Sequence, residues 1–428
     1  MKILVVSNTA WDDNNSFGNS FSNIFSGLDN IEIANVYCRK GFPRNNIKGK
    51  YFQIDEKRVF KSIFQPTIQT GYEVRQEQVP SENKQGSEKY YNFARLWRFR
   101  IFYCIRDFLW ALGNWNSKEL NDFVEEFQPD IMFQPVYYST YLNQIAKYMK
   151  KKFDIPMVCY ISDDNYTLRQ FSFSPIYWIE RLYKRRYVKK TIDLCDLLYV
   201  ISDVQKEEYE VIFKKNTKVL TKCMDFIGEA PIKQCVNKPI KIVYTGNIDR
   251  ERGKTICKVI KGIDKVNNDK INVCLDIYTK SPLKKSMLKK MSGRGIEFKG
   301  GVDVSEMEKI QLEADVLLLA EAMTKKGAMA VHQSFSTKIV DYMWRARCIW
   351  AVGHQECGAI DYFLKYDVGM VARTQHEIDA CLKRLVDSTE EEHKELARGV
   401  WKAGSIRHQR QTMQKELMEV LEKSIRDY

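Results

Sequence analysis

Residues 331–353, VHQSFSTKIVDYMWRARCIWAVG, contain a polar loop, a helix start and an apolar strand in one short stretch. Ser336 is placed to cap the helix, because a serine hydroxyl at this position accepts a bond from a free backbone N–H of the first turn. Thr337 and Lys338 fill that turn, and the apolar residues after them recur at helical spacing. The apolar run 348–352 is typical of a parallel strand that is buried on both faces. The stretch therefore predicts a helix and a strand of an α/β domain.

The start of this predicted helix is suited to an anion. Free backbone N–H groups and the ammonium of Lys338 both favour negative charge, so a phosphate could bind near Ser336, Thr337 and Lys338. Asp341 lies one helical turn further on, where a carboxylate suits ribose hydroxyl groups. The alternative interpretation is an ordinary capped helix that binds no ligand.

The stretch resembles the donor-site signature of family 4-type glycosyltransferases of the GT-B fold, in which two glutamates bracket a phosphate-binding helix start. The matching positions here are Gln333 and Asp341. Asp341 keeps a carboxylate on a shorter side chain, whereas Gln333 lacks the charge. The phrase FSTKIVDYM followed by an apolar strand is also similar to bacterial surface-polysaccharide transferases. The resemblance implies two Rossmann-like, doubly wound parallel-sheet domains with a cleft between them, and retention of anomeric configuration.

Length and composition limit the possibilities. A chain of 428 residues is long enough for two domains of ordinary size. A net charge of +13 favours an anionic partner, such as a nucleotide-sugar, an anionic membrane surface or a nucleic acid. We expect no nucleic acid, because no recognised RNA- or DNA-binding module occurs. The 11 cysteines include no Cys-x-x-Cys pair and indicate reduced thiols, and no run approaches the ~20 apolar residues of a membrane span. These features predict a cytoplasmic protein that is peripheral at the inner face of the cell membrane.

Alternating strand and helix patterns divide the chain. Residues 1–228 are predicted to form an acceptor-side Rossmann-like domain, with a polar insertion over 40–92 that is mobile or partly helical. Residues 239–405 are predicted to form a nucleotide-sugar-binding domain, after a linker rich in proline and glycine. The resemblance implies that 406–428 form a helix that returns towards the first domain. In the first domain, the loop holding Asn8 and Gly18 follows the first strand and should line the ligand site.

Two runs of the first domain combine aromatic and basic residues. The first, over 94–115, includes Trp97, Trp110 and Arg106, and the second, over 171–190, includes Arg181 and Lys184. Helices of this kind can lie in the interface of an anionic membrane. The alternative is that each is a core helix with one solvated face.

A loop after the first strand of the second domain, YTGNIDRERGKT, is suited to a diphosphate. Glycine lets the backbone approach a ligand closely, and arginine can bind phosphate through two parallel bonds. Two further polar residues end neighbouring strands and should point into the same crevice, unless they cap the next helices. The candidate residues of this group are Gly246, Asn247, Arg252, Lys254, Lys280 and Glu321.

Asp163 and Asp164 follow a predicted strand of the first domain, in the sequence YISDDNY. Paired carboxylates there could position an acceptor hydroxyl or accept its proton, or they could cap a helix. His332 could contact the sugar beside Gln333. We expect no metal and no other cofactor, because there is no Asp-x-Asp and no cluster at ligand spacing. Arg252 and Lys338 would then neutralise the diphosphate.

The sequence therefore predicts a glycosyltransferase of the hexosyltransferase type. It would move a sugar from a nucleotide diphosphate-sugar to a lipid-linked or glycan acceptor in surface polysaccharide assembly, and the family resemblance implies a retaining mechanism. The alternative is a non-catalytic GT-B-like subunit that binds lipid or a partner transferase. It is suggested by Gln333 and by the absence of a histidine before His332, since many family members carry one in the first domain.

Overall fold

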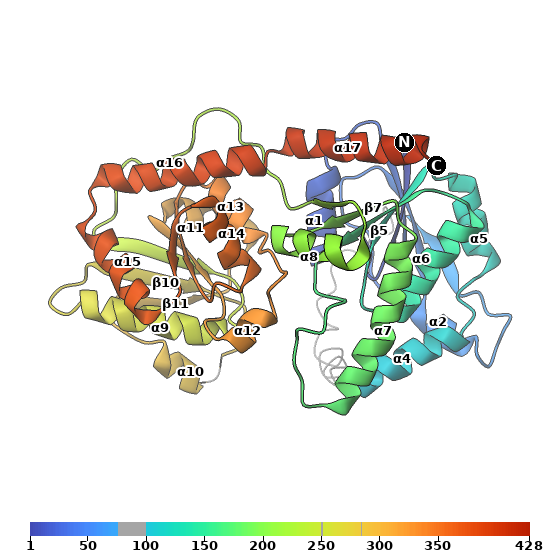
Figure 1. The fold of residues 1–428 in the computed structure, drawn as a ribbon, viewed down its shortest axis with the longest axis horizontal. Helices are drawn as coiled ribbons and strands as arrows, with labels where there is room; N and C mark the ends of the chain where they lie inside the picture. The colour runs from blue at the N-terminus through green and yellow to red at the C-terminus, as the bar shows by residue number, and fades with distance from the viewer. Residues whose placement is uncertain (76–99, 250, 284) are drawn as a thin grey trace. The chain divides into compact units, whose positions relative to one another are not determined.

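The computed structural model describes residues 1–75, 100–249, 251–283 and 285–428, which divide into two compact units (Figure 1). Unit 1 comprises Met1–Ile201, Lys206–Leu220 and Gln414–Tyr428, and unit 2 comprises Ser202–Gln205 and Thr221–Met413. Each unit contains one largely parallel sheet with helices packed on it. The predicted α/β class with two Rossmann-like domains is confirmed.

Unit 1 is built on an eight-stranded sheet in the order β4-β3-β2-β1-β5-β6-β7-β8. Only the pair β3 and β4 is antiparallel. Its strands are β1 (Lys2–Ser7), β2 (Glu32–Tyr37), β3 (Gly49–Ile54), β4 (Gly71–Val74), β5 (Ile131–Pro135), β6 (Met157–Ile161), β7 (Leu197–Val200) and β8 (Thr217–Val219). Its helices are α1 (Ser16–Phe25), α2 (Glu56–Lys61), α4 (Arg100–Leu112), α5 (Lys118–Phe127), α6 (Thr140–Lys152), α7 (Pro175–Asp193) and the greater parts of α8 (Asp203–Phe213) and α17 (Arg410–Arg426).

Unit 2 is built on a six-stranded sheet in the order β11-β10-β9-β12-β13-β14, with every pair parallel. Its strands are β9 (Ile240–Thr245), β10 (Val273–Tyr278), β11 (Ile296–Gly300), β12 (Val316–Ala320), β13 (Cys348–Val352) and β14 (Met370–Ala372). Its helices are α9 (Arg252–Val266), α10 (Lys285–Lys290), α11 (Val304–Glu313), α12 (Lys325–Met329), α13 (Lys338–Trp344), α14 (Gly358–Tyr366), α15 (Gln375–Asp387) and α16 (Glu390–Arg407).

The central strands follow from continuous apolar runs. Every residue of β5, β6, β7, β12 and β13 is buried, as expected for parallel strands covered by helices on both faces. In unit 2, α9 and α15 pack side by side, and a methyl group on Gly262 of α9 would lie 2.7 Å from Leu382 of α15. The close packing of these layers leaves the carboxyl ends of the strands as the place for a ligand.

The structure describes residues 40–75 of the predicted insertion over 40–92, and these contain two strands as well as a helix. Residues 49–74 form β3, α2 and β4, and thereby complete one edge of the unit 1 sheet. Tyr51, Phe52 and Ile54 are buried, so this short strand contributes to the core despite its polar flanks. Residues 76–92 of the predicted insertion lie outside the described residues.

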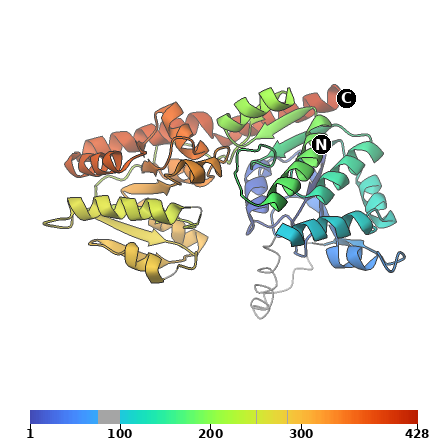
Figure 2. The same cartoon turned by 60° about the horizontal axis from the view of Figure 1, so that its bottom comes forward.

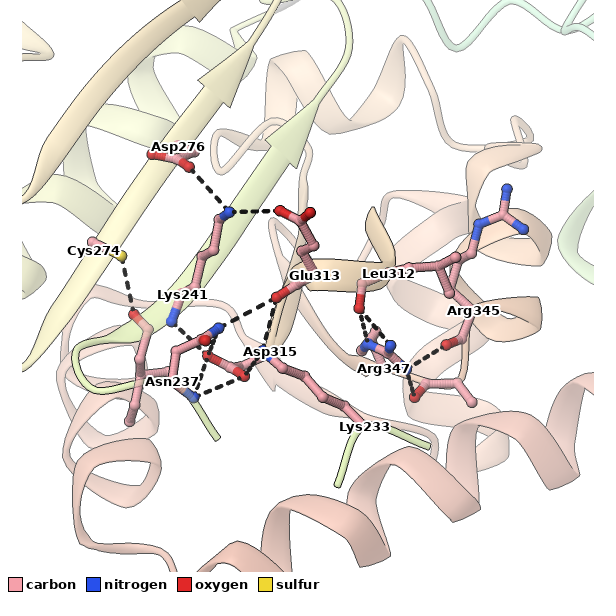
Figure 3. A network of polar contacts seen from close by, with 12 residues as sticks. Lys233, Asn237, Lys241, Cys274, Asp276, Leu312, Glu313, Asp315, Arg345 and Arg347 are labelled. Carbon is pink, nitrogen blue, oxygen red and sulfur yellow. Dashed lines mark hydrogen bonds and ion pairs between the residues drawn. The ribbon is translucent and has the colours of Figure 1, made fainter. Parts of the chain in front are cut away.

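The linker is held against unit 2 by one buried carboxylate (Figure 3). Asp315, just before β12, accepts bonds from the ammonium of Lys233 at 2.6 Å, the side-chain amide of Asn237 at 2.9 Å and the backbone N–H of Lys241 at 2.7 Å. Because the linker has no helix or strand of its own, these bonds satisfy polar groups that a regular element would pair internally.

The C-terminal helix belongs to unit 1 from Gln414 onward. The side-chain amide of Gln414 donates to the carbonyls of Ile24 at 2.9 Å and Ser26 at 2.7 Å, and so caps the end of α1. Among the described residues, none of the helices combines the length and apolar character that crossing a bilayer requires.

Candidate functional site

Four of the predicted donor-site residues meet at the carboxyl edge of the unit 2 sheet. Gly246 follows β9, Glu321 follows β12, Arg252 begins α9 and Lys338 begins α13. This is the edge at which parallel α/β sheets bind ligands.

The ammonium of Lys338 lies directly over Gly246. It donates to the carbonyl of Thr245 at 2.9 Å, and a methyl group on Gly246 would lie 1.7 Å from the Lys338 nitrogen. Gly246 has a φ of 138°, a backbone conformation that side chains rarely adopt, so both space and conformation require glycine here. Burial and then the nearby charge of Arg252 lower the pKa of Lys338 to about 8. No carboxylate forms an ion pair with Lys338 within the described ranges.

Arg252 and Glu321 hold each other through two parallel bonds. The guanidinium of Arg252 donates to the two carboxylate oxygens of Glu321 at 2.9 and 3.2 Å, and Glu321 is buried. The hydroxyl of Thr255 donates to the carbonyl of Glu321 at 2.6 Å. Glu321 therefore orients Arg252 beside Lys338, and the two carboxylate bonds leave the third guanidinium nitrogen with one long contact, to Asp249 at 3.4 Å.

The prediction that Ser336 caps the helix is wrong. Helix α13 begins at Lys338, and its N-cap residue is Thr337, whose side chain makes no capping bond. Thr337 already has helical backbone angles, with φ −58° and ψ −22°. The carbonyl of Ser336 instead accepts a bond from the backbone N–H of Ile339 at 2.9 Å, which begins the first turn.

In unit 1, the loop after β1 is shaped by close contacts. The hydroxyl of Tyr141 donates to the side chain of Asn8 at 2.9 Å, and Arg106 donates to that hydroxyl at 2.7 Å. A methyl group on Gly18 would lie 2.1 Å from the carbonyl oxygen of Asp12, so Gly18 is required for backbone packing. The loop therefore has a fixed conformation at the carboxyl edge of this sheet.

The two predicted acceptor-side aspartates have different surroundings. Asp164 forms an ion pair with Arg181 at 2.9 Å and accepts bonds from the backbone N–H groups of Tyr166 and Thr167 at 3.2 and 2.7 Å. These contacts stabilise the turn after β6, but they do not cap a helix, because the next helix, α7, begins only at Pro175. Asp163 is exposed to solvent at the same strand end.

Comparison with solved structures gives the fold class. HepE from Anabaena in complex with UDP-glucose superposes with a TM-score of 0.59 at 11% identity, over 99% of this chain and 100% of that one. An α,α-trehalose-phosphate synthase (UDP-forming) from Burkholderia vietnamiensis gives 0.58 at 10% identity, over 99% and 100%. The corresponding enzyme from Burkholderia xenovorans, in complex with glucose-6-phosphate, gives 0.57 at 10% identity, over 98% and 100%. The chain has the GT-B fold. No protein-family model matches the sequence, and a search of curated proteins found no significant match.

Asp341, one of the two positions that carry the sequence resemblance, has a partner that the sequence did not indicate. The ammonium of Lys222 lies 2.6 Å from the Asp341 carboxylate. The two residues are 119 positions apart, so spacing along the chain could not reveal the pair. The side chain of Asp341 is 27% exposed, which leaves it accessible to a ligand hydroxyl.

The other signature position, Gln333, is turned inward. Its side chain lies 3.4 Å from the amide of Gln205, its carbonyl accepts a bond from Ser202 at 2.7 Å, and the residue is 1% exposed. His332 lies beside it, and its ring pairs with the carbonyl of Glu356 at 2.7 Å. Gln333 and His332 therefore both contact other residues of unit 2.

Three other predicted donor residues make their contacts outside the group of Gly246, Arg252, Glu321 and Lys338. Lys254 is 69% exposed and pairs with Glu251 at 2.7 Å. Lys280 is exposed and lies along Gly301, where an added methyl group would be 2.4 Å from its side chain. Asn247 is exposed, and its carbonyl accepts a bond from the Tyr244 hydroxyl at 2.6 Å.

A buried polar pair next to Lys338 was missed. The hydroxyls of Thr245 and Tyr342 lie 2.7 Å apart, and Gln311 donates to the Thr245 hydroxyl at 3.3 Å. Tyr342 is four residues after Lys338 on α13, so helical spacing could have suggested that the two share a face. Among the described residues, no group of three or more His, Cys, Asp or Glu side chains is arranged to hold a metal.

The two basic and aromatic runs are more internal than predicted. Arg106 pairs with Glu56 at 2.6 Å, and Trp110 is fully buried. In α7, Arg181 pairs with Asp164, and Lys184 contacts Asp107 at 3.0 Å and Glu180 at 2.9 Å. These cations therefore pair with carboxylates of unit 1, of which Asp107 and Glu180 are buried. Trp97 and the rest of the run up to residue 99 lie outside the described residues.

Proposed function

We propose that this chain is a glycosyltransferase whose unit 2 binds a nucleotide diphosphate-sugar. The single observation that carries the proposal is the ammonium of Lys338, whose pKa is lowered chiefly by desolvation and which forms no ion pair with a carboxylate in the described part of the chain. A cation that is partly removed from water and has no ion-pair partner is unfavourable unless an anion binds to it. A diphosphate supplies that anion.

The neighbouring groups suit a diphosphate. Gly246 has no side chain, so a phosphate can approach the backbone next to Lys338. Arg252 is oriented by Glu321 and offers a further cation. In this proposal the two basic side chains neutralise the diphosphate without a metal, and Asp341 binds a ribose hydroxyl. Because HepE was solved with UDP-glucose and the Burkholderia enzymes are UDP-forming, UDP-glucose is the first donor to test.

The finer parts of the proposal concern the acceptor. We infer a lipid-linked or glycan acceptor in surface polysaccharide assembly, a retaining mechanism, and a peripheral position at the inner face of the cell membrane. The surface-polysaccharide context and retention rest on the family resemblance of residues 331–353. Of the two aspartates after β6, we assign Asp163 to the acceptor hydroxyl because it is exposed to solvent, whereas the side chain of Asp164 is 8% exposed.

A second candidate function is a non-catalytic GT-B subunit that binds lipid or a partner transferase. The burial of Gln333 favours it, because this position holds a glutamate in the family signature and its side chain here contacts Gln205. Such a subunit could still bind a nucleotide but would not transfer a sugar.

The test combines binding and turnover. A thermal-shift screen with UDP, GDP, ADP and CMP and their sugar conjugates should single out one base, because a ligand at about 100 times its Kd adds about 2.7 kcal/mol of stability. Release of that nucleotide from its sugar conjugate should then be measured with the unmodified chain and with Lys338→Met. Absence of any shift with all these ligands would contradict the proposal, whereas binding without nucleotide release would favour the non-catalytic subunit.

A further inference from the structure

Helix α7 of unit 1 exposes an unusual amount of apolar surface, together with the loop before it. Phe173 is 87% exposed, Ile179 is 70% exposed and Phe171 is 61% exposed. Of the 20 exposed large hydrophobic side chains among the described residues, 7 lie between positions 168 and 183. Scattered exposed apolar residues are normal in soluble proteins, but a concentration of this kind marks an interaction surface.

The aromatic tip of this surface is held in place. The hydroxyl of Tyr177 donates to the carbonyl of Gln170 at 2.8 Å, and the indole of Trp178 donates to the carbonyl of Ser172 at 2.7 Å. These bonds fix the loop onto the first turn of α7. Phe171 and Phe173 therefore remain outside, edge to face, with ring centroids 4.8 Å apart.

The inner side of α7 is fixed as well. Arg181 donates to the carbonyl of Thr167 at 2.6 and 2.8 Å, and Lys184 reaches Asp107 of α4 at 3.0 Å. Helices α4 and α7 lie side by side in both views of the molecule (Figures 1 and 2). Since each of these buried cations has its partner on the inner side, α7 cannot rotate to bury its apolar side without leaving charges unpaired.

The outer side of α7 changes character along its length. At 100° per residue, Ile176, Ile179, Arg186 and Lys190 fall on one stripe of the helix. The first half of the stripe is apolar and the second half is basic. Arg186 and Lys190 are exposed, and neither forms an ion pair in the described part of the chain. We define the α7 face as Phe171, Phe173, Ile176, Ile179, Arg186 and Lys190.

We propose that the α7 face docks on a lipid bilayer that contains anionic lipid, with its aromatic and aliphatic end inserted among the acyl chains and its basic end at the headgroups. The apolar half fits the boundary between headgroups and acyl chains, and each cation adds about 1 kcal/mol near an anionic surface. The inference deepens the proposed function and rests on it for the choice of a lipid-linked acceptor. A lipid bilayer is the expected partner because Phe171 and Phe173 lie on the same loop as Asp163, the residue that we assign to the acceptor hydroxyl.

This docking mode differs from purely electrostatic attraction of a basic helix to anionic lipid. Arg181 and Lys184 are buried in ion pairs and cannot contact the headgroups. Salt at about 1 M shortens the screening length to about 3 Å and removes most of the attraction between exposed charges. Insertion of apolar side chains is not screened. Binding should therefore weaken with salt but not disappear.

The test is flotation of the full chain with vesicles of phosphatidylcholine alone, and of phosphatidylcholine and phosphatidylglycerol in equal amounts. The double variant Phe173→Ser with Ile179→Ser should lose at least about tenfold in partition coefficient on both vesicles, and should lose the salt-resistant part. The double variant Arg186→Gln with Lys190→Gln should lose about fivefold per cation, on anionic vesicles only.

A matched control is the double variant Val211→Ser with Ile406→Ser, because these two side chains are 76% and 69% exposed on other helices. It should bind vesicles as the unmodified chain does. The proposal is overturned if the unmodified chain does not float at low salt, if high salt removes all binding, or if the control loses as much as Phe173→Ser with Ile179→Ser. A further outcome that overturns it is an unmodified chain that self-associates and does not bind vesicles, and whose self-association is abolished by Phe173→Ser with Ile179→Ser. The α7 face would then be a protein interface. UDP affinity measured on the same samples separates this inference from the proposed function: vesicle binding without nucleotide binding would contradict only the function.

Discussion

The substitution Lys338→Met should stabilise the unliganded protein. The pKa of Lys338 lies at about 8 in the fold against an ordinary 10.5, chiefly because the ammonium is buried. That difference corresponds to about 3 kcal/mol of unfavourable free energy for the charged form, at 1.36 kcal/mol per pKa unit. Methionine has a similar length and no charge, but it loses the bond to the Thr245 carbonyl, worth about 1 kcal/mol. The net gain in the free energy of unfolding should be about 2 kcal/mol, or about 4–8 °C in Tm for a unit of this size.

The gain in stability from Lys338→Met should depend on pH. A lysine whose pKa is lower in the folded than in the unfolded state carries its penalty in full below pH 8, where both states are protonated. Between pH 8 and 10.5 the folded state releases the proton first, and the penalty declines. The stability difference between Lys338→Met and the unmodified chain should therefore be largest at neutral pH and narrow progressively above pH 8. Urea unfolding at a series of pH values measures it.

The same substitution should weaken nucleotide binding. Loss of a charged hydrogen bond to a phosphate removes about 1.5–3 kcal/mol, which is about 10- to 150-fold in Kd. In the unmodified chain, affinity should be full below pH 8 and fall as the pH rises through the higher pKa that the bound anion gives Lys338. Isothermal titration with the nucleotide found by the screen measures both effects. A variant that is less stable at pH 7 and binds nucleotide unchanged would refute the assignment of Lys338 to the donor diphosphate.

Three further predictions concern other residues. Gly246→Ala should weaken nucleotide binding at least about tenfold, because the new methyl group would displace Lys338, and calorimetric titration measures it. Asp164→Asn should cost about 3–5 kcal/mol of stability by leaving a buried guanidinium unpaired, whereas Asp163→Asn should lower turnover by about 10²–10⁴. Asp315→Ala should cost about 3–5 kcal/mol in chemical unfolding and leave nucleotide affinity unchanged, because its contacts are with the linker.

Each has its own control. Gly228 also has a positive φ of 74° but no atom within 4 Å of an added methyl group, so Gly228→Ala should show backbone strain without loss of affinity. Asp193 pairs with Lys189 at the surface, and Asp193→Ala should cost less than about 1 kcal/mol, unlike Asp315→Ala. Equal loss of affinity in both glycine variants, full turnover in Asp163→Asn, or equal stability of the two alanine variants would contradict the respective predictions.

The sequence predicted the fold where strands are long and apolar. Strands β9, β12 and β13 were recognisable because both faces are buried and the runs are continuous. Strands β3 and β4 were missed because they lie in the polar segment 40–92, and because β4 is an edge strand of only four residues. An edge strand is buried by its neighbours in space, and the chain around it gives no periodic signal.

The candidate site was predicted in part. Gly246, Arg252, Glu321 and Lys338 come together because each lies at the end of a parallel strand or at the start of the next helix, which a sequence pattern can locate. The pair of Asp341 with Lys222 and the inward turn of Gln333 depend on segments far apart in sequence. Likewise, Arg181 and Lys184 suggested a solvated basic face, because the carboxylates that they neutralise lie in part on another helix and a loop.

Lys338 differs from another cation of the chain, Arg347, in how many of its N–H groups form hydrogen bonds. Arg347 also lacks a carboxylate ion pair among the described residues, and burial likewise lowers its pKa. Its guanidinium, however, donates to the carbonyls of Leu312, Pro231, Arg345 and Ala346, which satisfies a charge by local dipoles. An ammonium has three donors, and the structure gives Lys338 one bond, to Thr245. We therefore expect Arg347→Met to destabilise the protein, since four carbonyls lose their donor. We expect Lys338→Met to stabilise the unliganded protein, since the partner that the ammonium lacks is a ligand.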